Sequence, residues 1–171
     1  DEELRSFRPG VCNRLDRNTS GLIVAGKSLV GLQLMGEALK SRSLKKYYLC
    51  IVKGRMEKGA KISGYLIKDE KTNKVTVAQK PGEGFLPIET EYLPLSSSKD
   101  ATLLRVKLIT GRSHQIRAHL ASVGHPVGGD MKYGDRQFND LWKKKYGVTS
   151  QLLHSWKLVM PDAVPEPCAG L

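Results

Sequence analysis

Two runs of strand-forming residues, joined by a short polar link, constrain the fold of this chain most. Residues 88–95 and 101–109 are rich in apolar and β-branched side chains, and residues 96–100 between them read SSSKD. Two such runs separated by a few polar residues are typical of a β-hairpin. We therefore expect two antiparallel strands whose connection is exposed to solvent.

The rest of the chain alternates further short strands with three amphipathic segments. Strand-like runs cover residues 21–26, 47–52, 61–67, 74–78 and 152–160, and helical spacing covers residues 28–39, 114–123 and 138–146. Ser28 opens the first helix, and Ser113 can cap the second. The pattern predicts an α+β domain with a mixed, mostly antiparallel β-sheet flanked by a few helices. We expect residues 1–171 to form this one domain, without a linker.

An excess of basic residues limits the classes of partner. The chain has 28 Lys and Arg against 17 Asp and Glu, a formal net charge of +11, which favours RNA, DNA or an anionic membrane. No apolar run approaches the roughly twenty residues of a membrane span, and the acidic first residues do not resemble a signal peptide. The 3 cysteines, Cys12, Cys50 and Cys168, form neither a disulfide framework nor a CxxC motif. We expect a cytoplasmic protein that does not bind membranes, with Cys50 in its core.

One carboxylate lies between two guanidinium groups in residues 13–21, which read NRLDRNTSG. Arg14 and Arg17 favour the ionised form of Asp16, which keeps that carboxylate available as a nucleophile or a base. The same spacing also fits an aspartate in a surface salt-bridge network. Both interpretations stay open on spacing alone.

A second polar segment, residues 110–117, reads TGRSHQIR. It combines a tight turn, the start of a helix and two arginines, Arg112 and Arg117, an arrangement that can hold an anion at a helix N-terminus. The alternative is a capped helix with solvated basic side chains.

Taken together, three segments resemble the RluA-type pseudouridine synthases, and among them the RluC- and RluD-like members that act on large-subunit ribosomal RNA. Residues 14–21 resemble the motif HRLDxxTSG, and residues 46–54, KYYLCIVKG, resemble KxYxAxVxG. Residues 110–120, 124–126 and 129–134 match the family's third segment, and residues 153–158 resemble its closing segment. Three motifs in the family's order are more specific than any one of them.

The resemblance implies a reaction and a set of site residues. Members of the family detach uracil from its ribose, turn it and rejoin it through ring carbon five, with no metal or organic cofactor. The implied catalytic residues are Asp16, Tyr48 and Arg117, and Arg117 is expected to pair with and orient Asp16. On spacing alone, Tyr48 would be a cross-strand aromatic of the core. The expected RNA-binding residues are Arg14, Arg17, Lys46, Arg112 and His114.

Other basic residues have competing interpretations. Three lysines at positions 143–145 either contact phosphate or form a solvated face. Histidines at positions 114, 119, 125 and 154 do not follow a metal-binding pattern, so we expect capping, RNA contact or packing from them.

The sequence departs from the family pattern in two respects. Asn13 stands where the first motif commonly has histidine. Family catalytic domains also begin several tens of residues upstream, and ribosomal-RNA members often carry a small N-terminal RNA-binding domain. We therefore expect an N-terminally truncated fragment with an unpaired sheet edge. For the full-length protein we expect a monomer.

Two rival functions make different predictions. A catalytically inactive RNA-binding or ribosome-assembly module would bind RNA equally well after Asp16→Asn, with no turnover to lose. A metal-dependent phosphoesterase using the histidines would carry bound zinc or manganese. The enzyme hypothesis predicts that Asp16→Asn abolishes isomerisation and spares most RNA binding. We expect large-subunit ribosomal RNA as the substrate.

Overall fold

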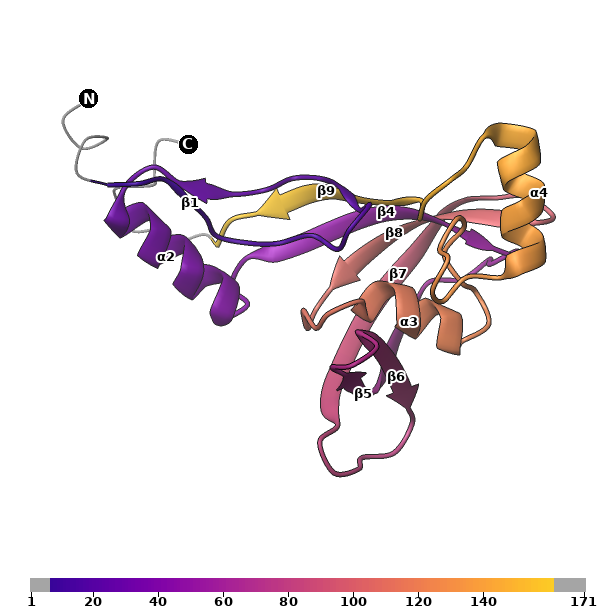
Figure 1. Ribbon diagram of the computed structural model, residues 1–171, viewed down its shortest axis with the longest axis horizontal. Coiled ribbons are helices and arrows are strands. Elements are labelled where there is room, and N and C mark those ends of the chain that lie inside the picture. Colours follow the sequence, from indigo (N-terminus) through magenta and orange to yellow (C-terminus); the bar gives the residue numbers. More distant parts are fainter. Residues whose placement is uncertain (1–6, 162–171) are drawn as a thin grey trace.

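A computed structural model describes residues 7–161 and places seven strands in one sheet, in the order β2-β9-β4-β8-β7-β5-β6 (Figure 1). These strands are β2 (Ser20–Gly21), β4 (Lys45–Lys53), β5 (Ala60–Asp69), β6 (Lys74–Ala78), β7 (Leu86–Ser97), β8 (Ala101–Leu108) and β9 (Leu153–Val159). All neighbouring pairs are antiparallel except β2 and β9. The predicted α+β class with a mostly antiparallel sheet is confirmed.

The predicted hairpin forms the central part of this sheet. β7 and β8 pair in antiparallel register from Thr90 opposite Leu108 to Ser97 opposite Thr102. The connection between them is exposed, as expected. β8 lies between β4 and β7, and its inward residues Leu104 and Val106 are 0% exposed. Burying an aliphatic side chain of this kind stabilises the fold by about 1.5–3 kcal/mol, so the hairpin contributes strongly to the core.

One helix covers the buried face of the sheet next to this hairpin. In α3 (Gln115–Ser122), Ile116 and Leu120 pack in one cluster with side chains of β4 and β8. Cys50 belongs to the same cluster and is 2% exposed, which confirms its predicted place in the core. Ile116 and Leu120 of α3 therefore share a core cluster with Tyr48 of β4.

Two further helices lie toward opposite ends of the molecule (Figure 1). α2 (Leu29–Lys40) begins after Ser28, whose hydroxyl accepts from the Gly31 amide at 3.1 Å. α4 (Arg136–Tyr146) is capped by Asp135 and ends at Gly147. Both predicted helices are confirmed. Within residues 7–161, no helix is long and apolar enough to cross a membrane.

The predicted strand at residues 21–26 is wrong as one element. The structure instead contains β2 and, four residues later, β3 (Ala25–Gly26), which pairs with β1 (Gly10–Val11) in a separate two-stranded sheet. The segment changes partner between β9 and β1, so it cannot keep one straight ladder. Leu22 and Ile23 lie at this change and are 44% and 49% exposed.

A β-bulge interrupts the pairing of β4 with β9. Tyr47 lies opposite Lys157 and Tyr48 lies opposite Ser155, so Trp156 is an extra residue in β9. A bulge of this kind re-aims the side chains around it. Ser155 is 1% exposed beside Tyr48, whereas Trp156 is 44% exposed.

Candidate active site

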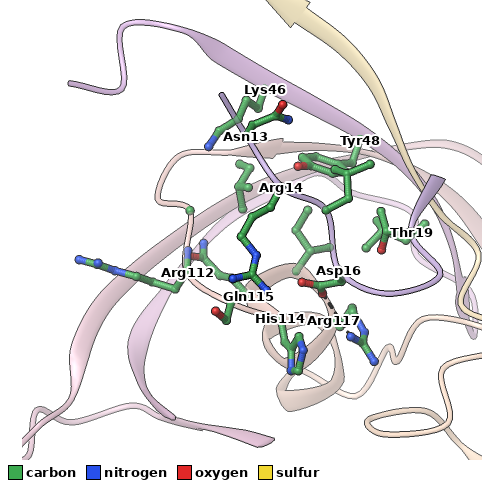
Figure 2. A pocket seen from close by; sticks show the side chains of 16 residues that line it. Asn13, Arg14, Asp16, Thr19, Lys46, Tyr48, Arg112, His114, Gln115 and Arg117 are labelled. Atoms are coloured by element: carbon green, nitrogen blue, oxygen red, sulfur yellow. Dashed lines mark hydrogen bonds and ion pairs between the residues drawn. The ribbon is translucent and has the colours of Figure 1, made fainter. Parts of the chain in front are cut away.

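A pocket of about 140 Å³ opens where the loop after β1 meets the start of β4 and the turn between β8 and α3. Figure 2 shows the side chains that line it. They come from all three segments that resemble the family motifs, although those segments are far apart in the sequence. Seven of the eight predicted site residues line this pocket: Arg14, Asp16, Lys46, Tyr48, Arg112, His114 and Arg117.

Asp16 projects into the pocket from its loop, and 23% of its side chain is exposed. One carboxylate oxygen, Oδ2, accepts from Arg117 Nη1 at 3.2 Å. The Asp16 carbonyl accepts from the Thr19 amide at 2.9 Å, which tightens the loop into a turn. The sequence placed Arg14 and Arg17 beside this carboxylate, but within residues 7–161 its ion-pair partner is Arg117, from α3.

The loop that carries Asp16 is tied down at both ends by side-chain amides. Asn13 Oδ1 accepts from the Val24 amide at 2.8 Å, and Gln151 Nε2 donates to the Arg17 carbonyl. Asn13 therefore closes the base of the loop, at the position where the family commonly has histidine. Gly21 ends the loop with a φ of +114°, and a side chain there would overlap the Ser155 backbone. Only glycine permits this approach to β9.

The turn before α3 is capped by a glutamine, which corrects the prediction that Ser113 caps the helix. The Gln115 carbonyl oxygen accepts from the Thr110 hydroxyl at 2.8 Å and from the Arg112 amide at 3.1 Å. Its amide nitrogen donates to the Glu89 carbonyl at 2.9 Å. The residue before the helix is His114, in the left-handed region at a φ of 54°. Gln115 thus links the turn to Glu89 of β7.

His114 faces the pocket and is bound from behind by a tyrosine. Its Nδ1 lies 2.7 Å from the Tyr133 hydroxyl, which in turn donates to or accepts from the imidazole according to the tautomer. Burial lowers the pKa of His114, and the nearby Arg117 and Lys132 act in the same direction, against Asp16 and Asp130. His114 is therefore a neutral hydrogen-bonding group at neutral pH.

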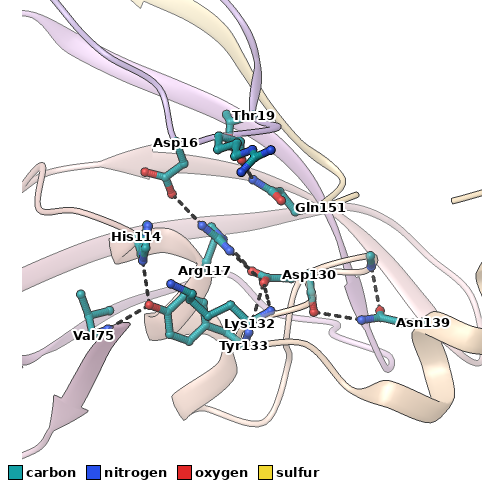
Figure 3. A network of polar contacts seen from close by, with 12 residues as sticks. Asp16, Thr19, Val75, His114, Arg117, Asp130, Lys132, Tyr133, Asn139 and Gln151 are labelled. Carbon is teal, nitrogen blue, oxygen red and sulfur yellow. Dashed lines mark hydrogen bonds and ion pairs between the residues drawn. The ribbon is translucent and has the colours of Figure 1, made fainter. Parts of the chain in front are cut away.

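Arg117 is held by a second aspartate that the sequence analysis did not select. Asp130 accepts from Arg117 Nε at 2.6 Å and from Nη2 at 2.9 Å, so the pair is bidentate (Figure 3). Burial alone would raise the pKa of Asp130, but hydrogen bonds from Arg117 and two backbone amides lower it below its ordinary value. Asp130 lies in the matched segment 129–134, and its acidic side chain in an otherwise Gly- and Pro-rich stretch was the available signal.

Tyr48 serves the core and the pocket at once. It is 8% exposed and belongs to the main core cluster, and its ring also lines the pocket (Figure 2). Burial raises the pKa of Tyr48, while a hydrogen bond with Ser155 opposes that shift. Its hydroxyl is therefore protonated at neutral pH and available as a donor. The two interpretations of this tyrosine, core aromatic and site residue, are compatible.

Basic residues surround the pocket unequally. Arg14, Lys46 and Arg112 line it, and burial together with Arg42 lowers the pKa of Lys46. Arg112 Nε is buried without a hydrogen-bond partner in the part of the chain that the structure describes. Arg17 is exposed and lies outside the pocket lining. The three lysines at 143–145 lie in the last turn of α4, also outside it.

The remaining histidines serve packing and local hydrogen bonds. His119 is 0% exposed and contacts the Thr90 hydroxyl at 3.0 Å, His125 contacts the Lys53 carbonyl, and His154 contacts the Ser20 hydroxyl. Across residues 7–161, no three His, Cys, Asp or Glu side chains gather as a metal site requires.

Comparison with known proteins places this site in a family. A sequence model described as RNA pseudouridylate synthase matches residues 1–122. The chain belongs to the RNA pseudouridylate synthase family. It is 34% identical, over 90% of its length, to ribosomal large subunit pseudouridine synthase C of Escherichia coli (strain K12), and 31% identical to the protein of that name from Vibrio cholerae serotype O1, also over 90%. The family predicted from the three motifs is confirmed.

Solved structures share the fold. Human RNA pseudouridylate synthase domain containing 1 superposes with a TM-score of 0.78 at 24% identity, over 90% of this chain and 64% of that protein. Human RNA pseudouridylate synthase domain containing 4 gives 0.76 at 23% identity, over 92% and 69%. The chain spans about half the length of the curated bacterial relatives it matches, 50% and 49% for the two named above.

Proposed function

We propose that this chain is the catalytic part of an enzyme that isomerises uridine to pseudouridine in RNA, with Asp16 as the essential carboxylate. The observation that carries the proposal is the ion pair of Asp16 with Arg117, inside a pocket lined by all three family motifs. Relatives named for the large ribosomal subunit support large-subunit ribosomal RNA as the substrate. The net charge of +11 suits a polyanion of that kind.

Asp16 begins the reaction in this proposal. Its first step is attack on the base, attack on the ribose carbon, or removal of a sugar proton, and each requires an ionised carboxylate with one oxygen open to the substrate. Arg117 binds Oδ2 of Asp16, and no partner within residues 7–161 binds Oδ1. The carboxylate is therefore both anchored and available.

A uridine inside folded RNA must leave its stack before it can enter this pocket. Extrusion of a base costs a few kcal/mol. Tyr48 can offset part of this cost by stacking on the uracil ring, a contact worth about 1–3 kcal/mol per base. We assign Arg14 to the space that the base vacates. The buried Tyr48 ring and the exposed Arg14 side chain fit these two tasks.

Phosphate contacts supply the rest of the binding energy. Lys46 and Arg112 line the pocket, and their cationic side chains can bind a phosphate there. Arg17 adds a further cation on the loop, and the neutral His114 on the α3 turn can form a hydrogen bond with the RNA. Since each neutralised phosphate releases counterions, RNA affinity should fall steeply with salt.

The test is tritium release from RNA labelled at uracil carbon five, with the parent protein and its Asp16→Asn variant. Asp140→Asn is a matched control, because Asp140 undergoes the same chemical change on the exposed face of α4. We expect release by the parent and by the control and none by Asp16→Asn, with RNA binding retained in all three. Release by Asp16→Asn would contradict the role of this carboxylate.

The rival function gives a different pattern in the same assay. A catalytically inactive RNA-binding module would bind RNA and release no tritium in any variant. That outcome would replace the proposed enzyme with a binding role.

A further inference from the structure

The Arg117 guanidinium lies between two aspartates that hold it in unequal ways. Asp130 binds the edge formed by Nε and Nη2 through two hydrogen bonds of 2.6 and 2.9 Å. Asp16 receives one hydrogen bond of 3.2 Å, from Nη1. The side chain of Asp130 is 0% exposed and that of Arg117 is 8% exposed. The stronger and more buried contact is thus with the aspartate outside the pocket lining.

Asp130 is itself fixed by its surroundings. Its Oδ1 also accepts from the backbone amides of Lys132 and Tyr133, at 2.8 and 3.1 Å. Its backbone carbonyl accepts from Asn139 Nδ2 at 2.9 Å, and Asn139 Oδ1 accepts from the Gly129 amide at 2.7 Å. The loop that carries Asp130 is therefore bound to α4, and the carboxylate has little freedom to turn.

The contact with Asp130 affects how Arg117 can hydrogen-bond to the two carboxylate oxygens of Asp16. A guanidinium is a planar fork that prefers to bind a carboxylate through two parallel hydrogen bonds. With Asp130 on the Nε–Nη2 edge, the guanidinium is held in an orientation in which Nη1 makes a single hydrogen bond to Asp16 Oδ2. The Tyr133 ring, whose centroid is 5.2 Å from Arg117 Cζ, covers one face of the guanidinium and limits its rotation.

We infer that Asp130 is a positioning residue for the isomerisation: it fixes Arg117 so that one carboxylate oxygen of Asp16 is anchored and the other stays open to the uridine. Without Asp130, the Arg117 guanidinium would be free to rotate, and its single contact with Asp16 would no longer be fixed. Asp130 acts through Arg117 and does not itself touch the substrate. This inference rests on the proposed function, in which the Asp16 carboxylate is the reacting group.

The first measurement needs no turnover. In NMR spectra of the parent protein, the Arg117 Nε–H should give one slowly exchanging signal, because that proton is buried in a charge-assisted hydrogen bond. The signal should persist in Asp16→Asn and disappear in Asp130→Asn. A rapidly exchanging signal in the parent, or one that survives Asp130→Asn, would overturn the inference. The parent spectrum decides this even if Asp130→Asn does not fold.

The second measurement separates positioning from general structure. Asp130→Asn should lower kcat for tritium release on the order of 100-fold, the size expected from misplacing a reacting group by about 1 Å, with KM nearly unchanged. In an Arg117→Gln background the same substitution should cause no further loss. Losses that multiply in the double variant would show that Asp130 acts independently of Arg117. The double variant removes both buried charges, so it also serves if the single variant is unstable.

The two measurements distinguish this inference from the proposed function. No tritium release by the parent would refute the function and, with it, the claim that Asp130 positions a catalytic group. The NMR signal would still report whether Asp130 fixes Arg117. Release by the parent together with an unaffected Asp130→Asn would refute the positioning role alone.

Discussion

Asp16 and Asp130 pair with the same arginine, yet they belong to regions built in different ways. Arg117 of α3 lines the pocket and Asp130 lies behind that lining; we call this region the floor, and the side chains of Asp130 and Arg117 are 0% and 8% exposed. Residues 13–20 form the rim, where the Asp16 side chain is 23% exposed and the loop is held by Asn13 and Gln151. The floor is held together by a buried ion pair, whereas the rim is held by a few hydrogen bonds.

This difference indicates which part of the site must keep a fixed side-chain orientation. The floor must hold the guanidinium in one orientation, which a buried bidentate pair can do. Under the proposed function the rim admits a nucleotide beside Asp16, which suits residues that are partly exposed and held by few contacts. Free energy of unfolding should therefore depend strongly on the floor and weakly on the rim, whereas RNA affinity should show the reverse.

The largest expected effect is the loss of the floor carboxylate. Asp130→Ala should lower the free energy of unfolding by about 3–5 kcal/mol, because it leaves a buried guanidinium without its main partner. Asp16→Ala, at the rim, should cost less than about 1 kcal/mol, since Arg117 keeps Asp130. Urea denaturation of the two variants measures both values. Equal losses would remove the distinction between floor and rim.

A smaller effect is expected at the base of the rim. Asn13→Ala removes the hydrogen bond to the Val24 amide and should cost about 1 kcal/mol of stability. Amide exchange at Val24 should become faster. Gln137→Ala, which truncates an exposed amide on α4, is the control and should change stability by no more than about 0.5 kcal/mol. If Val24 stays protected in Asn13→Ala, Asn13 does not close the loop.

Acidification should also act on the floor. Burial lowers the pKa of His119 below its ordinary 6.5, and within residues 7–161 its Nε2 has no hydrogen-bond partner. The unfolded chain therefore binds a proton near pH 6.5 that the folded chain binds only at lower pH. Stability from this group is complete above pH 6.5 and is lost as pH falls toward the folded pKa. Urea midpoints should fall over that window, and less so in His119→Gln. An unchanged slope in the variant would exclude His119 as the source.

The smallest effect on stability is expected from the exposed arginines of the rim. Arg14→Gln and Arg17→Gln should each change the free energy of unfolding by no more than about 0.5 kcal/mol. If each arginine binds one phosphate, its removal should reduce the slope of log affinity against log salt by about 0.7 on single-stranded RNA. Arg136→Gln, on a side chain that is 95% exposed on α4, should keep the parental slope. Reduced slopes in all three variants would mean that binding depends on net charge alone.

The fold could be predicted wherever one local pattern decides the structure. The hairpin of β7 and β8 follows from two apolar runs and a polar link, and α2 follows from Ser28 and regular apolar spacing. The segment at 21–26 failed because its apolar residues link two sheets. Ser113 failed as a cap because Gln115, within the helix, reaches back to Thr110 and Arg112.

Part of the site could also be predicted, but mainly from the family resemblance and less from local sequence patterns. Local charges placed Arg14 and Arg17 beside Asp16, whereas its partner Arg117 lies 101 residues away and was expected only through family resemblance. Asp130 was missed because its role depends on its contact with Arg117, which forms only in the folded chain. Its place in the matched segment 129–134 was the one signal, and that signal names no partner.

The bulge at Trp156 has a consequence for how relatives of this chain can differ in length. On either side of it, β9 keeps a regular register with β4, and Tyr48 stays opposite Ser155. Removing Trp156 would leave both registers as they are, whereas removing a residue farther from the bulge would shift the residues between that position and the bulge by one and turn their side chains over. Alignment gaps within this strand should therefore collect at or next to position 156, where they keep the register on both sides of the bulge.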